Sequence, residues 1–276
     1  MVSGRSGSIG GSANSGEDTE VDHLIVGSVI KAFRVLEAFS KARPLMGFSQ
    51  IARETGLERS AAQRAAHTLW KLGYLDKVGP DGEYRLSMRC LDLSQSYLAS
   101  HRIVTKARPY LKFLRRKTNA TIALTMLDDT NTVQVLRYVS MEMLSNAMDT
   151  GTRLPAYCSA SGVAILSAMP DATVRQILAR SDLKPMMPNT VWHADKIMER
   201  VQRSREEGYV LGVEEDFASD ITIASAVRDP LTGEVAAICA SYSSESVSPE
   251  GVIDDCRQMI ISTANEIRSN LAVART

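Results

Sequence analysis

The chain has 276 residues, of which 44% are hydrophobic and 23% are charged. This composition is typical of a globular protein and argues against a disordered one, and the length suits two domains of average size. No apolar run approaches the roughly 18 residues that a membrane span needs, and the polar N-terminus does not resemble a signal peptide. Four scattered cysteines without a Cys-x-x-Cys pair favour free thiols over disulfides or a structural zinc. We therefore expect a cytoplasmic protein with no membrane segment and no metal site.

Basic side chains are concentrated in one third of the chain. Lysine plus arginine and aspartate plus glutamate both total 32, so the formal net charge is zero. Residues 28–118 nevertheless hold 18 basic and 7 acidic side chains, and the rest of the chain is correspondingly acidic. A basic module fused to an acidic domain is typical of nucleic-acid-binding proteins, although basic side chains also cluster on solvated helix faces of proteins that bind no nucleic acid.

The N-terminal third has the pattern of a small DNA-binding domain. Residues 1–25 are rich in Gly and Ser, and we expect a disordered tail there. A first helix then begins near its candidate N-cap Ser28 and turns one apolar face inward, formed by Val29, Ala32, Phe33, Leu36 and Phe39. Helices over 48–54 and 58–72 follow, and two short strands flank the turn Gly79-Pro80-Asp81-Gly82. This order predicts a winged helix-turn-helix over 26–88.

The remainder is predicted to be a helical linker over 89–118 and an α/β domain over 119–276. The linker helices lie over 91–100 and 108–117, with Pro109 in the first turn of the second. Candidate strands cover 121–126, 132–138, 208–213, 223–228 and 234–241, and candidate helices cover 161–169, 171–179, 194–207 and 249–271. The turn Asp229-Pro230-Leu231-Thr232-Gly233 joins two strands as a hairpin, which indicates an antiparallel sheet. The fold class is therefore α+β.

The helix over 58–72 is the candidate DNA-reading element, because the second helix of such a pair enters the major groove. Its alanine-rich side, with Ala62, Ala66 and Leu69, would pack on the domain. The DNA-binding candidates are the polar residues of the other side and two basic residues of the wing: Arg59, Ser60, Gln63, Arg64, His67, Lys77 and Arg85. Exposed arginines also occur without a partner, and His67 could equally be a packing residue. We expect double-stranded operator DNA as the partner.

Several ordered motifs make the sequence similar to one family of regulators. They include Gly56-Leu57-Glu58-Arg59-Ser60, Gly82-Glu83-Tyr84-Arg85-Leu86 and Gly151-Thr152-Arg153-Leu154-Pro155. Over residues 26–271 the chain resembles the isocitrate lyase regulator (IclR) family of transcriptional regulators. The resemblance implies a winged helix, a helical linker and a GAF-like effector domain, assembly into dimers or tetramers, and a small organic acid as effector. The chain departs from the family pattern at Val163, Ser219 and Ser225-Ala226, where lysine, glycine and Ala-Pro are usual.

The start of the helix at 161 is the candidate effector site. Free backbone N–H groups and the helix dipole favour a carboxylate there. The resemblance places contacts at the backbone of Ala160 and Ser161, and at Gly212 and Thr222. Further candidates are Ser159 as a cap, Asp220 and Ser225 as polar contacts, and Met126, Met143 or Met148 as an apolar side. No Lys or Arg is evident at this site, which favours a small mono-acid or hydroxy acid.

Two other readings of the second half are weaker. Cys158 with a histidine could form a nucleophile and base, but none of these residues lies in a recognisable motif. Glu214-Glu215-Asp216 could hold a cation or act as paired carboxylates, but adjacent acidic residues are more often a solvated strand end or an interface. An RNA-binding module is disfavoured because aromatic platforms are lacking. We expect a regulator with no cofactor, a repressor of a catabolic operon that its effector releases; the alternative is an enzyme with an accessory basic domain. Candidate dimer contacts lie in the linker, at Leu91, Tyr97, Leu98, Leu111 and Leu114.

Overall fold

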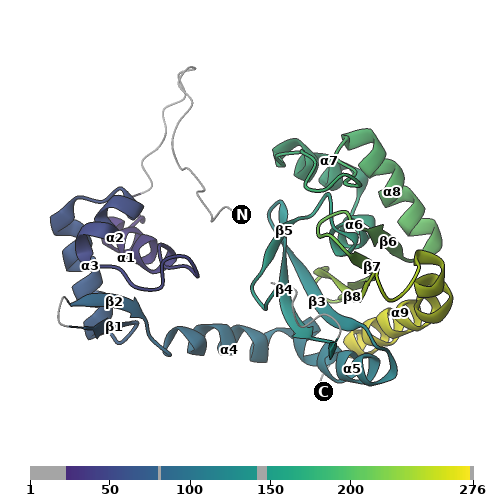
Figure 1. The fold of residues 1–276 in the computed structure, drawn as a ribbon, viewed down its shortest axis with the longest axis horizontal. Coiled ribbons are helices and arrows are strands. Elements are labelled where there is room, and N and C mark those ends of the chain that lie inside the picture. The colour runs from purple at the N-terminus through teal and green to yellow at the C-terminus, as the bar shows by residue number, and fades with distance from the viewer. Residues whose placement is uncertain (1–22, 80–81, 142–147, 274–276) are drawn as a thin grey trace. The chain divides into compact units, whose positions relative to one another are not determined.

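The computed structural model describes residues 23–79, 82–141 and 148–273, which form two compact units divided between Leu93 and Ser94 (Figure 1). Most of the predicted tail over 1–25 lies outside the described residues. Pro80 and Asp81 of the predicted wing turn and the candidate Met143 lie outside them as well. Each unit is described below by itself.

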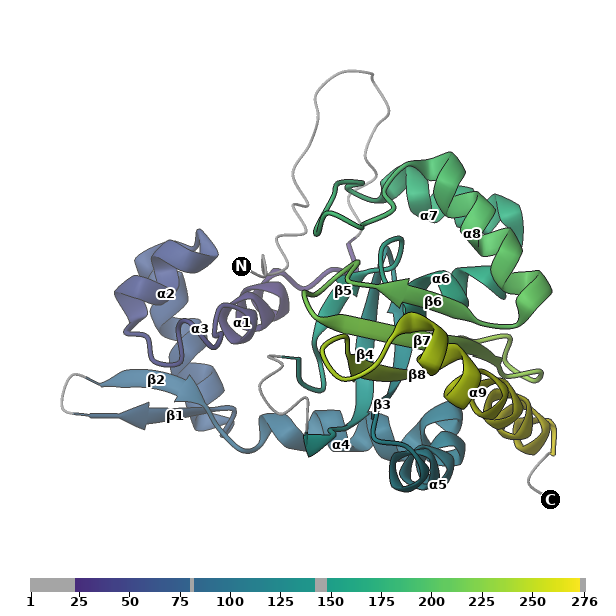
Figure 2. The ribbon, with the colours of Figure 1, turned by 45° about the vertical axis from the view of Figure 1, so that its right-hand side comes forward.

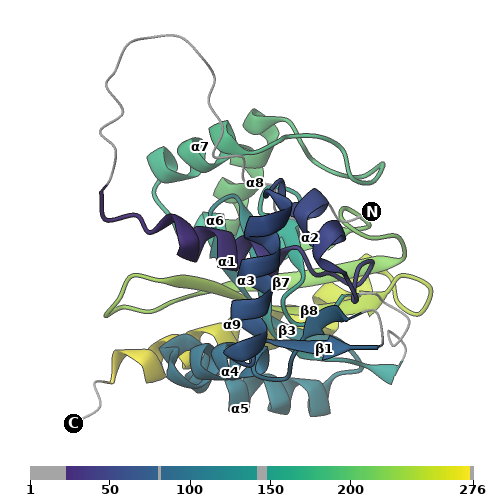
Figure 3. The ribbon, with the colours of Figure 1, turned by 90° about the vertical axis from the view of Figure 1, so that its left-hand side faces the viewer.

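The first unit is a winged helix-turn-helix, as the sequence predicts. Helices α1 and α2 pack against α3 (Figure 3). The wing is an antiparallel pair in which Leu75 lies opposite Leu86. Gly56 ends α2 in the left-handed conformation with φ of 68°, which a glycine adopts without strain. The elements are α1 (Gly27–Glu37), α2 (Phe48–Thr55), α3 (Arg59–Lys71), β1 (Leu75–Val78) and β2 (Glu83–Leu86).

The inward face of α1 matches the predicted one only in part. Val35 is fully buried and Phe39, just beyond the helix, is 8% exposed, whereas Val29 and Phe33 are 51% and 53% exposed. The helix begins at Gly27 with Val26 as its N-cap, so Ser28 does not cap it. The prediction is wrong for Val29 and Phe33, whereas Ala32 and Leu36 pack against the core and Phe39 is part of it. Helix α1 carries apolar residues on two faces, and periodicity alone does not show which of them meet α2 and α3.

The two linker helices have different surroundings. Helix α4 (Cys90–Ser100) contains no buried residue. Helix α5 (Arg102–Lys117) begins six residues before the predicted start, so that Pro109 lies inside it and not in its first turn. Its buried residues join the core of the second unit, namely Ile103, Val104, Ala107, Leu111 and Leu114. Apolar burial therefore makes α5 a structural part of the second unit.

The second unit is built on a six-stranded antiparallel sheet in the order β5-β4-β3-β8-β7-β6 (Figure 2). Helices α5 and α9 cover one face, and α6 packs on the other face together with α7 and α8. The predicted hairpin at 229–233 joins β7 to β8. The elements are β3 (Thr121–Asp128), β4 (Asn131–Tyr138), β5 (Arg153–Pro155), α6 (Ala160–Ser167), α7 (Asp171–Arg180), α8 (Ala194–Glu207), β6 (Val210–Val213), β7 (Asp220–Arg228), β8 (Val235–Ser243) and α9 (Pro249–Ala272).

The two faces of this sheet have different chemistry. The face toward α5 and α9 is lined by large aliphatic side chains such as Ile122, Leu124, Ile223 and Ile238. The face toward α6 carries small residues, including Ala123, Ala224, Ala237 and Cys239, together with buried polar side chains. Small residues let α6 approach the strands closely, and Asp220 and Thr222 of the effector candidates lie on this face. Of the helices that the structure describes, none is both long and apolar enough to cross a bilayer.

Candidate functional site

Helix α3 presents the five polar residues predicted for DNA reading on its exposed side. Arg59, Ser60, Gln63, Arg64 and His67 are all exposed. On the opposite side Ala62 and Ala66 are fully buried and Leu69 is 4% exposed. The arrangement holds α3 firmly on its domain while its polar face is free to enter a groove.

Aromatic contacts connect this polar face with the rest of the domain. The Arg59 guanidinium lies 4.9 Å from the Phe48 ring centroid at the start of α2. His67 contacts Trp70 edge-on, with ring centroids 5.3 Å apart, so it is an exposed residue with a packing contact. The Lys77 ammonium lies 5.8 Å from the same Trp70 ring, which places the wing lysine beside α3. Arg85 pairs with Asp76 at 3.3 Å across the wing, where solvent screens the pair.

The first turn of α6 is held close to β6. Ser159 caps the helix, because its hydroxyl accepts the Gly162 N–H at 3.1 Å. Ala160 and Ser161 are buried, with 4% and 8% exposure. A Cβ on Gly212 of β6 would lie 3.2 Å from the Ala160 Cβ. The structure thus brings four of the predicted effector residues, Ser159, Ala160, Ser161 and Gly212, to one place.

Asp220 and Thr222 belong to the polar face of the sheet, but Ser225 does not. The Thr222 hydroxyl lies 2.7 Å from Asp220 Oδ2, to which it donates, and 2.5 Å from Ser241 Oγ. Ser225 lies opposite Ile238 on the aliphatic face, and its hydroxyl donates to the Gly208 carbonyl at 2.8 Å. Met126 also belongs to the aliphatic core, and Tyr97 contacts its sulfur. The structure therefore leaves Ser225 and Met126 apart from this group.

An arginine that the sequence analysis missed lies on the same polar face. Arg137 of β4 is opposite Ala123 of β3, and Gln134 is opposite Thr125 two residues further along β3. The pairing register shifts between these positions, so a β-bulge brings residues 134 and 137 to one face. Arg137 Nη1 donates to Gln134 Oε1 at 3.3 Å, and Gln134 Nε2 donates to the buried Met148 sulfur at 3.2 Å. The position of Arg137 inside the strand predicted over 132–138 was the one feature of the sequence that could have pointed to it.

Burial shifts the titration of the carboxyl groups around this face. Burial raises the pKa of Asp220 to about 6, while the Thr222 hydrogen bond and the Arg137 charge oppose the shift. Burial, together with the charges of Asp220 and Glu215, raises the pKa of Asp216 to about 7. Glu215 pairs with Arg200 at 2.9 Å, and burial raises its pKa as well. The site is thus a low-dielectric polar cluster in which carboxyl protons are held tightly.

The raised pKa of Asp216 predicts a pH-dependent cost to folding. The folded state holds this proton more tightly than the unfolded state, whose pKa is 3.8, so stability falls as pH rises from about 4 to about 7. We expect Asp216→Asn to raise the free energy of unfolding by about 1–3 kcal/mol at pH 8, with a gain that shrinks as pH is lowered to 4.5. Urea titrations across this range measure the gain. A gain that grows on acidification would contradict the assignment.

The surroundings of Cys158 argue against the alternative that the second half is an enzyme with a cysteine nucleophile. Burial is the main reason that the pKa of its thiol is raised to about 12, and the thiol lies 3.4 Å from the Pro155 carbonyl. A protonated, buried thiol is a poor nucleophile. Within the part of the chain that the structure describes, no three His, Cys, Asp or Glu side chains are placed to hold a metal ion.

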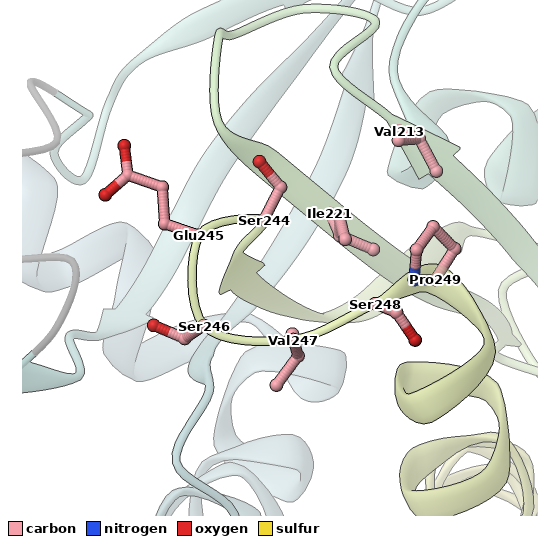
Figure 4. A pocket seen from close by; sticks show the side chains of 8 residues that line it. All are labelled: Val213, Ile221, Ser244, Glu245, Ser246, Val247, Ser248 and Pro249. Atoms are coloured by element: carbon pink, nitrogen blue, oxygen red, sulfur yellow. The ribbon is translucent and has the colours of Figure 1, made fainter.

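A separate open pocket of about 410 Å³ lies between the β6–β7 edge and the loop that leads into α9 (Figure 4). Val213 and Ile221 come from the strands, and the segment 244–249 supplies hydroxyl groups and the Glu245 carboxylate. Its lining residues include one acidic and no basic side chain. Its charge therefore does not favour an anion.

An exposed recognition helix joined to a domain with a buried polar cluster defines a DNA-binding regulator with an effector domain. The profile described as "IclR helix-turn-helix domain" matches residues 28–79, and that described as "Bacterial transcriptional regulator IclR C-terminal" matches residues 95–269. The chain therefore belongs to the IclR family of transcriptional regulators. The predicted α+β class is confirmed, and the matched proteins are regulators, not enzymes.

Individual relatives agree with this family. The p-hydroxybenzoate hydroxylase transcriptional activator of Acinetobacter baylyi is 30% identical, over 93% of this chain and 95% of the relative. A solved transcriptional regulator from Rhodococcus sp. RHA1 is 27% identical with a TM-score of 0.81, covering 90% of this chain and 99% of that one. An IclR homologue from Microbacterium hydrocarbonoxydans was solved in complex with 4-hydroxybenzoate. It is 24% identical with a TM-score of 0.76, and the match covers 90% of this chain and 100% of that one.

Proposed function

We propose that this protein is a cytoplasmic repressor of a catabolic operon and that a small organic acid releases it from operator DNA. The observation that carries the proposal is the exposed polar face of α3, opposite two fully buried alanines. The relative from Acinetobacter baylyi is named as the transcriptional activator of p-hydroxybenzoate hydroxylase. That name supports an acid-responsive catabolic role here, while the sign of control is our own proposal.

The α3 residues have distinct roles in this proposal. Arg64 and Gln63 read base edges in the major groove, because guanidinium and amide groups make bidentate contacts with guanine and adenine. Arg59, Ser60 and His67 position the helix on the phosphates. In the wing, Lys77 and Arg85 contact the neighbouring backbone. All seven residues are exposed.

We further propose that two copies bind a pseudopalindromic operator. No residue of helix α4 is fully buried, and its Leu91, Leu93 and Tyr97 are 66%, 54% and 46% exposed. Leu111 and Leu114, which the sequence suggested as dimer contacts, are fully buried in their own domain core and are not available. The exposed apolar side chains of Leu91 and Leu93 fit a contact with a second copy, and a palindromic site needs a two-fold protein.

The effector site is proposed at the first turn of α6 and the sheet face below it. The backbone at Ala160 and Ser161, the Ser159 hydroxyl and the Asp220–Thr222 pair surround this place, next to Gly212. Ser225 lies on the other face of the sheet, so we leave it out of the proposed site. Occupancy by an acid would link β7, β8 and α6, which form the centre of the domain.

The test uses the purified full chain and the DNA upstream of the genes adjacent to its own. We expect a dimer or tetramer by light scattering, a footprint over two half-sites about 34–36 Å apart or a multiple of that, and release on addition of an organic acid. Deletion of the gene should raise transcription from that promoter. A monomer with full operator affinity would contradict the assembly, and a fall in transcription on deletion would reverse the sign of control.

A further inference from the structure

The C-terminal end of α3 brings two lysines to one tryptophan. The Lys71 ammonium lies 4.2 Å from the centroid of the Trp70 ring, and the Lys77 ammonium of β1 lies 5.8 Å from the same centroid. Both distances are within the roughly 6 Å over which an aromatic ring attracts a cation. Trp70 is half-buried and packs against the core of the first unit. The ring therefore joins a lysine of the recognition helix to a lysine of the wing, and we call these three residues the Trp70 cluster.

A second contact fixes the wing side of the Trp70 cluster. A Cβ on Gly82 would lie 2.6 Å from Lys77 Cε and 3.3 Å from its Nζ, so the lysine side chain lies directly over this glycine. Gly82 has a φ of 68°, a conformation that glycine adopts without strain. The absence of a side chain at Gly82 thus leaves the space that Lys77 occupies.

Neither ammonium group is neutralised within the part of the chain that the structure describes. Asp76, the acidic residue next to Lys77, pairs with Arg85 across the wing, and no described carboxylate forms an ion pair with Lys71 or Lys77. The two ammonium groups are no more than about 10 Å apart, which is about one Debye length at 0.1 M salt, so they repel each other. An anion that contacts both would relieve this repulsion.

The Trp70 cluster continues the face of α3 that carries the proposed base-reading residues. Arg64 and His67 are followed by Lys71 one helical turn further on, and all three side chains are exposed. His67 also contacts the Trp70 ring edge-on. When this face lies in the major groove, the end of the helix meets the sugar-phosphate backbone that borders the groove. A phosphodiester is therefore the anion that this position favours.

We propose that the Trp70 cluster is a phosphate clamp, in which Trp70 is a positioning residue that holds Lys71 and Lys77 against one stretch of the DNA backbone. The inference rests on the proposed function, because it places α3 in the major groove. The ring links the two lysines before DNA arrives, which reduces the side-chain entropy that they lose on binding. Phosphate contacts carry no sequence information, so the clamp adds affinity and fixes the register of the domain without selecting bases.

The test measures the affinity of the full chain for cognate and scrambled duplexes by fluorescence anisotropy at several salt concentrations. Lys71→Met and Lys77→Met should each weaken binding to both duplexes about 5-fold and flatten the slope of log affinity against log salt by about 0.9. Trp70→Leu removes no charge, yet it should also flatten the slope, because the lysines lose their support. Lys112→Met, which removes an exposed lysine of α5 in the second unit, should bind like the wild type.

A double-mutant cycle separates positioning from packing. Lys77→Met should weaken binding about 5-fold in the wild type but less than about 2-fold in Trp70→Leu, because the lysine is already displaced there. Trp70→Phe keeps an aromatic face and should recover part of the affinity and of the slope. Circular dichroism checks that each variant is folded. The lysine variants change only exposed side chains, so they test the clamp even if Trp70→Leu unfolds.

Three outcomes would count against these assignments. Wild-type affinity in both lysine variants would overturn the clamp. A wild-type slope in folded Trp70→Leu, or losses that simply add in the double variant, would overturn the positioning role of Trp70. Equal affinity of the wild type for cognate and scrambled duplexes would refute the proposed operator reader but not the clamp, which is independent of sequence and is measured on both duplexes.

Discussion

Gly162→Ala is expected to destabilise the effector domain by about 3 kcal/mol or more. A Cβ at this position would lie 2.1 Å from the carbonyl oxygen of Ala156, and 2.6 Å and 2.7 Å from its Cα and carbonyl carbon. These are backbone atoms and cannot rotate away as a flexible side chain would. The first turn of α6 would have to separate from residue 156, and the contacts of the helix with β7 and α8 would loosen.

Gly251→Ala is the matched control for this variant. Both glycines are in the first turn of a helix and donate their N–H to a serine cap three residues earlier, Ser159 in α6 and Ser248 in α9. At Gly251 the nearest atom to a new Cβ is the Ser248 hydroxyl at 3.6 Å, which is ordinary contact. Alanine should be neutral there or stabilise by up to about 1 kcal/mol. Urea unfolding followed by circular dichroism compares the two, and equal behaviour would refute the steric argument.

Replacing Arg59 and Arg64 together by alanine is expected to reduce operator affinity about 100-fold or more without unfolding the protein. Both side chains are exposed on α3, so the folded core does not depend on them. Loss of a bidentate base contact costs about 1–3 kcal/mol and relaxes specificity, whereas loss of a phosphate contact weakens all sequences alike. Gel-shift titrations of each single variant on cognate and scrambled duplexes separate the two roles.

Arg175→Ala serves as the control for charge alone, because it removes an exposed arginine from α7 in the second unit. It should leave operator affinity unchanged. The salt dependence of binding gives a second measure, since each lost phosphate contact lowers the slope against log salt by about one. Unchanged affinity in both the Arg59 and the Arg64 variants would show that α3 is not the DNA-reading helix.

Local signals in the sequence determined much of this architecture. The alanine-rich side of α3 and the polar residues between its apolar positions predicted both its packing and its exposed face, because helical period places them on opposite sides. The Pro–Gly turn at 229–233 predicted the β7–β8 hairpin, and the helix over 194–207 was predicted with its observed ends. Such features depend on residues that are neighbours along the chain or one helical turn apart.

Tertiary packing decided what local periodicity left open. Helix α1 carries apolar residues on two faces, and its periodicity alone does not show which of them meet the core. Helix α5 belongs to the second unit because its apolar stripe lies against β3, β4 and α9. Two serine-capped glycines are alike in sequence, yet only Gly162 lies against another backbone. Strand alternation would place residues 134 and 137 on opposite faces, and only the bulge in β4 brings them together. The sequence could therefore locate α6 but could not show that Arg137 lies on the sheet face beneath it, because a one-residue change of register depends on the pairing of strands and not on the order of residues.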